Sequence, residues 1–147
     1  MEIVKEAYWI TTDKEKIDVP FVHDFLSQSY WAQGIPLEVV QRSIEGSLVF
    51  GLFHQEQQVG FARVITDEAT FAYLADVFVT EAYRGQGLSK WLMQVITEHP
   101  SLQGLRRFVL LTRDAHGLYR QFGFTPITNH DAWMQIHQPD VYKNVLS

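Results

Sequence analysis

The sequence predicts an α/β (α+β) fold within one chain of 147 residues. Short apolar runs bounded by turn residues indicate strands, and apolar residues spaced three and four apart indicate helices. These elements follow one another without a linker, an internal repeat or a low-complexity tract. A chain of this length can bury a core of its own. We therefore expect a single domain over residues 1–147.

The first third of the chain predicts one strand and two helices. Residues 7–12 form the strand. Asp18 stands where a helix cap belongs, because the apolar residues after it fall at helical spacing. Residues 29–35 are expected to form a loop, and Pro36 suits the start of a second helix that continues to about residue 43.

Three strands are predicted in the middle of the chain, at residues 47–53, 59–65 and 71–79. The last two would form a hairpin centred near residues 67–68. Side chains alternate along a strand, so one face of residues 71–79 would carry Phe71, Tyr73, Ala75, Val77 and Val79, and the other would carry Leu74, Asp76 and Phe78. In the hairpin, Phe61, Arg63 and Ile65 would share the face of Tyr73 and Ala75.

The last third predicts a helix whose apolar face begins at Leu88 and which ends near His99 and Pro100. Residues 108–111 form a strand covered on both faces, because it has no alternation. Residues 114–122 form a helix that ends at Gly123. Residues 124–127 and 133–137 are predicted as closing strands. The predicted order is therefore β-α-α-β-β-β-α-β-α-β-β.

The most informative stretch is residues 77–89, where an apolar strand leads through an Arg-Gly-x-Gly turn into a helix. Gly85 and Gly87 allow positive φ and a close approach of the backbone to a ligand. The free amides of the first helical turn point to the same place, where the helix dipole favours negative charge. Arg84 adds a fixed positive charge. The turn predicts a site for a phosphate or pyrophosphate.

The turn matches neither a Walker loop nor a dinucleotide fingerprint, which need other residues after Gly87. The pattern Arg84-x-x-Gly87-x-Ser89, with Asp-Val-Phe-Val before it, resembles the pyrophosphate loop of the GNAT superfamily of acetyl-CoA-dependent acyltransferases. Ser89 replaces the last small residue of the family pattern. A second match follows at residues 115–124, which are similar to the family segment Ala-x-x-Leu-Tyr-x-x-x-Gly-Phe. Thr112 stands where the family often has Asn.

The resemblance implies a mixed, mostly antiparallel sheet flanked by helices, with acetyl-CoA as co-substrate. It also implies roles for individual residues. The backbones of Val77 and Val79 would pair with the pantetheine arm, and the Val77 amide would lie near the thioester oxygen. Tyr119 would protonate the leaving thiolate, while Tyr30 and Trp31 would border the acceptor pocket. The cofactor-binding set would comprise Val77, Val79, Arg84, Gly85, Gln86, Gly87, Leu88, Ser89 and Thr112.

Several side chains have two interpretations on the sequence alone. Tyr119 is either the proton donor or a packed aromatic residue. Asp76 is either a general base or a structural carboxylate, and a water chain reached through Tyr73 is an alternative base. Arg63 could bind a carboxylate of the acceptor, or form a salt bridge at the sheet surface. Trp133 could reach the acceptor pocket or belong to the core.

Composition narrows the function further. A formal net charge of −5 argues against a general nucleic-acid binder. No apolar run approaches membrane-spanning length, and the N-terminus lacks a secretory pattern, so we expect a cytoplasmic protein. The chain has no cysteine, which excludes disulfides, thiolate metal sites and a cysteinyl-acyl intermediate. The histidines show no tight ligand spacing, so no metal is expected.

The chemistry favoured at this point is N-acetylation by direct attack in a ternary complex. The acceptor would be a primary amine of a small molecule, and the protein a monomer or homodimer. Two alternatives remain open. One is acetylation of a protein lysine or N-terminus. The other is a non-catalytic CoA-binding sensor or interaction domain.

Overall fold

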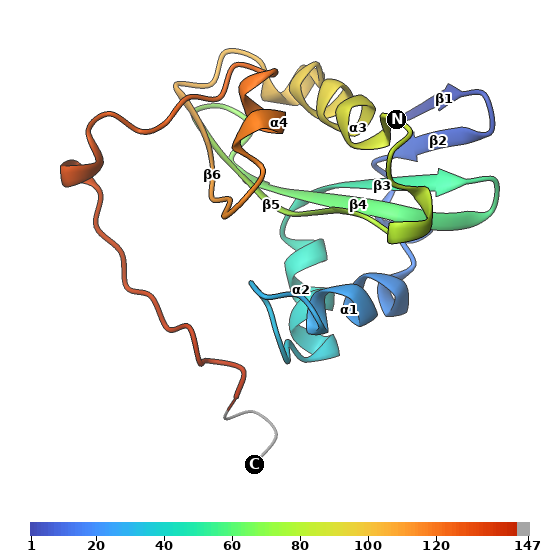
Figure 1. Cartoon of the computed structure of the whole chain (residues 1–147), viewed down its shortest axis with the longest axis horizontal. Helices are drawn as coiled ribbons and strands as arrows, with labels where there is room; N and C mark the ends of the chain where they lie inside the picture. The colour runs from blue at the N-terminus through green and yellow to red at the C-terminus, as the bar shows by residue number, and fades with distance from the viewer. Residues whose placement is uncertain (144–147) are drawn as a thin grey trace.

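The computed structural model describes residues 1–143. A twisted six-stranded sheet in the order β1-β2-β3-β4-β5-β6 forms its centre, with helices on both faces (Figure 1). The strands are β1 Glu2–Lys5, β2 Tyr8–Thr11, β3 Leu48–His54, β4 Gln57–Thr66, β5 Phe71–Val79 and β6 Arg107–Leu110. The helices are α1 Val19–Ser27, α2 Leu37–Glu45, α3 Leu88–Thr97 and α4 His116–Arg120, with short 3-10 turns between some elements.

The sheet is mixed and mostly antiparallel. Neighbouring strands from β1 to β5 pair antiparallel, and only β5 and β6 run parallel. The parallel pair is possible because α3 forms the crossover between its two strands. This architecture confirms the predicted fold class.

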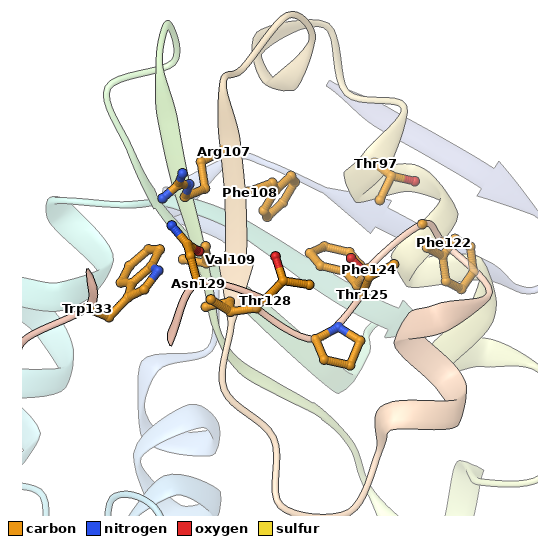
Figure 2. A pocket seen from close by; sticks show the side chains of 13 residues that line it. Thr97, Arg107, Phe108, Val109, Phe122, Phe124, Thr125, Thr128, Asn129 and Trp133 are labelled. Atoms are coloured by element: carbon orange, nitrogen blue, oxygen red, sulfur yellow. The ribbon is translucent and has the colours of Figure 1, made fainter. Parts of the chain in front are cut away.

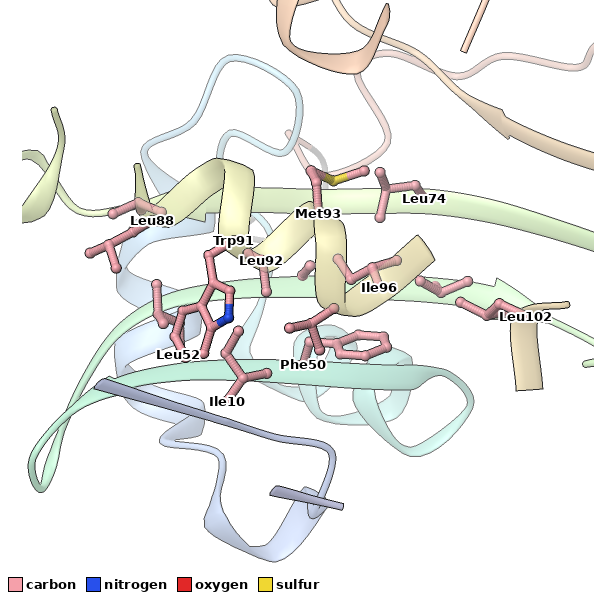
Figure 3. Packing of buried hydrophobic residues seen from close by; sticks show 14 of the residues in the cluster. Ile10, Phe50, Leu52, Leu74, Leu88, Trp91, Leu92, Met93, Ile96 and Leu102 are labelled. Atoms are coloured by element: carbon pink, nitrogen blue, oxygen red, sulfur yellow. The ribbon is translucent and has the colours of Figure 1, made fainter. Parts of the chain in front are cut away.

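The two faces of the sheet bury separate apolar clusters. Helix α3 covers one face, where Trp91, Leu92 and Ile96 pack onto Phe50 and Leu52 (Figure 3). Helices α1 and α2 cover the other face (Figure 1), and their apolar residues meet the sheet there. The second cluster comprises Ile17, Val22, Leu26, Ala32, Ile35, Val40, Ile44, Val49, Phe61 and Phe78. Strands β3 to β5 contribute to both clusters and so hold the layers together.

The predicted starts of the first two helices are confirmed. The Asp18 side chain accepts a hydrogen bond from the Phe21 amide at 3.1 Å, which satisfies one of the free donors of α1. Pro36 is the N-cap of α2, with an extended backbone that leads directly into the helix. No helix within residues 1–143 is both long and apolar enough to cross a lipid bilayer.

The two ends of the chain differ from the prediction. The strand expected at residues 7–12 has a partner before it, because β1 and β2 form a hairpin. Helix α4 covers only residues 116–120, shorter than the predicted 114–122. The closing strands predicted at 124–127 and 133–137 are not formed. Residues 125–143 instead run as an extended, largely exposed segment, here called the C-terminal arm (Figure 1). A strand requires a hydrogen-bonded neighbour, and no strand within residues 1–143 pairs with the arm.

Candidate active site

The glycine turn between β5 and α3 has the conformation that the sequence predicted. Gly85 and Gly87 have φ values of +82° and +80°, in the left-handed region that favours glycine. Gly87 is the N-cap of α3, and no side chain caps the helix there. The first-turn amides are therefore available to an anion. A Cβ at Gly85 or Gly87 would meet no other protein atom within 4 Å, so the turn borders open space.

A hollow of about 310 Å³ lies against this turn. Leu118 of α4 forms one of its walls, so both regions with the predicted family motifs meet at one site. Its lining residues are Val79, Tyr83, Arg84, Gly85, Gly87, Leu88, Ser89, Lys90 and Leu118. The Arg84 Nε donates to the Val79 carbonyl at 2.9 Å, which ties the turn to the end of β5. This fixes the guanidinium at the rim of the hollow.

The edge of β5 that faces β6 is unpaired over its second half. Strand β6 pairs with β5 from Phe71 only as far as Leu74, whereas β4 pairs with the opposite edge as far as Val79. Within the described part of the chain, Ala75 to Val79 therefore offer backbone groups without a strand partner on that side. An extended ligand with amide groups can pair there as an added strand. The position agrees with the predicted backbone roles of Val77 and Val79.

A β-bulge interrupts β5 at this point. Phe78 pairs with Phe61 and Ala75 with Arg63, so Ala62 lies opposite two residues, Asp76 and Val77. Asp76 has a φ of +55°, a left-handed conformation that Asp tolerates better than most residues. The bulge locally increases the twist of the strand and frees backbone groups from the ladder. It lies directly beside the unpaired edge.

The bulge corrects the predicted assignment of faces. Strict alternation placed Val77 with Tyr73 and turned Asp76 away from them. In the structure, Val77 packs with Leu74 on the α3 face, and Asp76 lies on the Arg63 side of the sheet. The extra residue shifts the alternation by one position, so the two halves of β5 follow opposite phases.

Asp76 is a satisfied structural carboxylate, as the second interpretation of its sequence context expected. One oxygen accepts from the Arg63 Nε at 2.9 Å and the other from the Trp31 indole at 2.9 Å. The Arg63 Nη1 also donates to the Ser47 hydroxyl at 3.2 Å. The exposed fractions of the Arg63 and Asp76 side chains are only 17% and 8%. Arg63 therefore forms a nearly buried salt bridge with Asp76.

The same network holds Trp31 of the α1–α2 loop above the bulge. Neighbouring Tyr30 makes an edge contact with Trp31, and the Arg113 guanidinium lies 3.7 Å from the centroid of the Tyr30 ring. The segment after β6 and the α1–α2 loop therefore meet through a cation–π contact. Sequence reasoning missed Arg113. Arg113 follows β6, which runs parallel to β5. Parallel strands end at the same edge of a sheet, so this position could have indicated that Arg113 lies near the end of β5.

Tyr119 and Tyr73 are two phenols of this region whose pKa values are raised. Tyr119 lies on α4 and is 9% exposed. Burial raises the pKa of Tyr119, and the nearby Tyr30 and Asp114 raise it further. Burial likewise raises the pKa of Tyr73; Asp76 adds to this effect and Arg63 opposes it. Both phenols are therefore neutral at physiological pH and can donate a hydrogen bond.

The structure also gives the surroundings of Thr112 and Trp133. The Thr112 hydroxyl accepts from the Ala115 amide at 3.0 Å, so this side chain organises the start of α4. Trp133 does not join Tyr30 and Trp31. Its ring lies 5.0 Å from the Arg107 guanidinium at the beginning of β6, beside a separate cavity (Figure 2). The arm leads it there because the predicted closing strand is not formed.

Comparisons with known proteins find a matching family and several similar chains. Residues 45–126 match the family model of the acetyltransferase (GNAT) domain. A Gibberella zeae protein named as a candidate acetyltransferase is 31% identical, in a match that covers 76% of this chain and 75% of that protein. A crystal structure of a candidate GNAT-family acetyltransferase from Xanthomonas campestris pv. campestris is 51% identical, with a TM-score of 0.91 over 93% of this chain and 97% of that one.

A third similarity concerns the fold alone. A predicted acetyltransferase of Clostridium acetobutylicum, whose crystal structure contains acetyl-CoA, is 12% identical to this chain. The TM-score is 0.64, and the match covers 93% of this chain and 96% of that one.

Proposed function

This chain belongs to the GNAT acetyltransferase family, and we propose that it transfers the acetyl group of acetyl-CoA to the primary amine of a small molecule by direct attack in a ternary complex. The unpaired edge of β5, which leads into the uncapped start of α3, is the observation that carries the proposal. It provides backbone groups for an extended amide-containing arm and then amides for a pyrophosphate, in the order in which CoA carries them.

The residues divide into two groups around this edge. The turn formed by Arg84, Gly85, Gln86, Gly87, Leu88 and Ser89 would hold the pyrophosphate, and Thr112 would support the adjoining segment. The Val77 and Val79 backbones would align the pantetheine arm. The Val77 amide would donate to the thioester oxygen, where negative charge develops as the amine attacks.

Two proton transfers accompany the reaction. The amine must lose a proton, and the leaving thiolate must gain one. Tyr119 is proposed as the donor to the thiolate because its raised pKa keeps it protonated. The amine would lose its proton to water reached past Tyr73. Asp76 is not proposed as the base, since both its oxygens already accept hydrogen bonds from Arg63 and Trp31.

The acceptor would enter on the side of Tyr30 and Trp31. The contact between Arg113 and Tyr30 joins the α1–α2 loop to the segment after β6. A contact that closes the acceptor side in this way would favour a small amine over an extended peptide. Arg63 would act as a positioning residue, because it fixes Asp76 and through it the Trp31 indole.

A panel of amines, amino acids and polyamines, assayed by release of free CoA with a thiol reagent, tests the proposal. The chain has no cysteine, so the protein contributes no thiol background. Turnover of a small amine, with Tyr119→Phe as the matched impaired variant, would support the proposal. Turnover of only peptide or protein amines would replace the acceptor class. Binding of acetyl-CoA without turnover of any amine would contradict an enzymatic role.

A further inference from the structure

Arg113 joins the segment after β6 to the α1–α2 loop (Figure 1). Its guanidinium carbon lies 3.7 Å from the centroid of the Tyr30 ring, a separation at which the guanidinium stacks on the face of the ring. The Thr112 hydroxyl accepts a hydrogen bond from the Ala115 amide at 3.0 Å, and this bond closes a short turn around Arg113. The backbone and the side chain of Arg113 are therefore both held in place.

The charge of Arg113 has no counter-ion in the described part of the chain. Within residues 1–143, its guanidinium forms no salt bridge, and neighbouring Asp114 does not pair with it. Stacking on Tyr30 covers one face of the guanidinium and leaves N–H groups along its edge. A planar row of N–H donors matches the two oxygens of a carboxylate.

Arg63 has a different environment on the same side of the sheet. Its Nε donates to Asp76 at 2.9 Å and its Nη1 donates to the Ser47 hydroxyl at 3.2 Å. The charge of Arg63 is thus compensated inside the protein, whereas the Arg113 side chain is exposed. The carboxylate-binding role that the sequence left open for Arg63 therefore suits Arg113 better.

Tyr30 connects Arg113 to the proposed reacting centre. Burial is the main cause of the raised pKa of Tyr119, and Tyr30 adds to it, so the two phenols lie within electrostatic reach of each other. Strand β6 pairs with β5 only as far as Leu74, three residues before Val77. Arg113 follows this divergence and borders the opening between β5 and the segment after β6.

We propose that Arg113 selects the acceptor by binding its carboxylate, so that the acceptor is a small amine with a carboxylate, such as an amino acid. This inference rests on the proposed acetyl transfer. The carboxylate would accept two hydrogen bonds from the guanidinium edge, while Tyr30 keeps the guanidinium preorganised. The acceptor nitrogen would form its bond to the acetyl carbon as the bond from carbon to sulfur breaks, giving an N-acetyl amino acid and CoA.

Paired acceptors isolate the contribution of the carboxylate. Each amino acid of a panel is assayed beside its carboxamide, which keeps the side chain and the amine but lacks the negative charge. Release of free CoA gives kcat/KM for both. The two amines differ in their own pKa, so the quantity compared between variants is the ratio of kcat/KM for the amino acid to that for its carboxamide.

Arg113→Gln removes the charge and should lower this ratio by at least about tenfold, because hydrogen bonds to a charged partner are among the stronger ones. Arg113→Lys keeps the charge but not the paired geometry, so the ratio should fall by a smaller factor. Arg42→Gln removes an exposed arginine of α2 and is the matched control, with an unchanged ratio. Thermal unfolding verifies that each variant is folded.

Binding measurements separate this inference from the proposed function. If no amine is turned over, the acetyl transfer fails. Calorimetry with CoA present then tests Arg113 directly, because the amino acid should bind more tightly than its carboxamide and Arg113→Gln should remove the difference. Equal binding of the two would overturn the inference.

Two kinetic outcomes would overturn the carboxylate assignment alone. One is turnover of carboxamides or simple amines as readily as amino acids by the natural protein. The other is a ratio that Arg113→Gln leaves unchanged, because the carboxylate would then be bound elsewhere or not at all.

Discussion

The Tyr119 side chain is buried, and its hydroxyl is the proposed proton donor to the leaving thiolate. Its ring packs near Phe124 in the cluster under α3, and its burial raises the pKa of the phenol from the usual value of 10.0. The raised pKa disfavours phenolate, which favours the proposed role of Tyr119 as an acid over a role as a base. The packing fixes the ring independently of the hydroxyl.

Tyr119→Phe should therefore lower kcat without weakening acetyl-CoA binding. Phenylalanine preserves the ring contacts and removes only the proton donor. General-acid catalysis typically contributes about 10²–10⁴-fold, and we expect a loss of at least tenfold. Steady-state kinetics and calorimetry measure the two quantities separately.

The pH profile of the same pair of proteins checks the assignment. A raised pKa means that the donor remains protonated past the usual tyrosine range, so the Tyr119-dependent part of kcat should persist to about pH 10 and fall only above it. The variant should lack that alkaline decline. An unchanged kcat in Tyr119→Phe would mean that water protonates the thiolate.

Arg63 and Asp76 form a nearly buried pair, and removal of one partner leaves the other uncompensated. Arg63→Met should lower the free energy of unfolding by about 3–5 kcal/mol. Asp76→Asn retains an acceptor for Trp31 and tolerates the left-handed backbone, so a double-mutant cycle with Arg63→Met isolates the pair. Urea titrations supply the four free energies. Absence of coupling between the two sites would contradict a structural role for Arg63.

The kinetic consequence of the Arg63 pair is also specific. A positioning role predicts that Arg63→Lys changes KM equally for acceptors with and without a carboxylate. A larger rise in KM for carboxylate-bearing acceptors would instead support a direct contact between Arg63 and the acceptor carboxylate, which is the alternative that the sequence left open.

At the scale of elements, the turn requires glycine because of its positive φ, and not because a side chain would clash with other protein atoms. Gly87 and Gly104 both have positive φ, and a Cβ at either would meet no other protein atom within 4 Å. They differ in place, because only Gly87 borders the hollow at the start of α3. This gives a matched pair of positions for a test.

Gly87→Ala and Gly104→Ala should each lower stability by about 1–2 kcal/mol, since an L-residue is strained in the left-handed region. Only Gly87→Ala should also weaken acetyl-CoA binding, because its methyl group projects into the space of the pyrophosphate. Calorimetry and thermal unfolding of both variants measure the two effects. An equal affinity for acetyl-CoA in the two variants would contradict the proposed pyrophosphate site.

The turn and the helix starts were predictable because they depend on local rules. A cap such as Asp18, or a glycine with positive φ, is determined by residues close in sequence. The bulge in β5 was not predictable in this way. It arises from the pairing of β5 with β4, which are distant from local sequence rules. The left-handed conformation of Asp76 cannot be read from the pattern of apolar residues.

At the scale of the whole molecule, both clusters depend on the central strands. Leu92 packs on one face of the sheet and Phe61 on the other, and each is fully buried. Loss of either face removes support from strands β3 to β5. We therefore expect the domain to unfold as one cooperative unit.

Leu92→Ala should lower the free energy of unfolding by about 2–5 kcal/mol and leave a single transition. Far-ultraviolet circular dichroism follows the whole sheet, whereas fluorescence includes Trp91 in the α3 cluster. The two probes should give the same midpoint in the variant as in the natural protein. Separate midpoints would show that the faces unfold independently.

The predicted closing strands show where sequence patterns reach their limit. Residues 133–137 have the alternation of a strand, but this pattern does not indicate which strand they would pair with. The strand order of β1 to β6 follows chain order, so neighbours were easy to infer. No strand within residues 1–143 pairs with the arm, so the alternation of residues 133–137 alone could not predict how this segment folds.

The bulge at Asp76 also bears on how this protein could change over generations. Loss of that single codon would restore regular alternation, and every other side chain of β5 would keep the face that it has now. The buried side chains would keep their packing. Arg63 would lose its salt-bridge partner, and β5 would lose the extra twist that the bulge gives it. An in-frame deletion of three nucleotides would thus preserve the fold and remove the Arg63–Asp76 salt bridge in a single step.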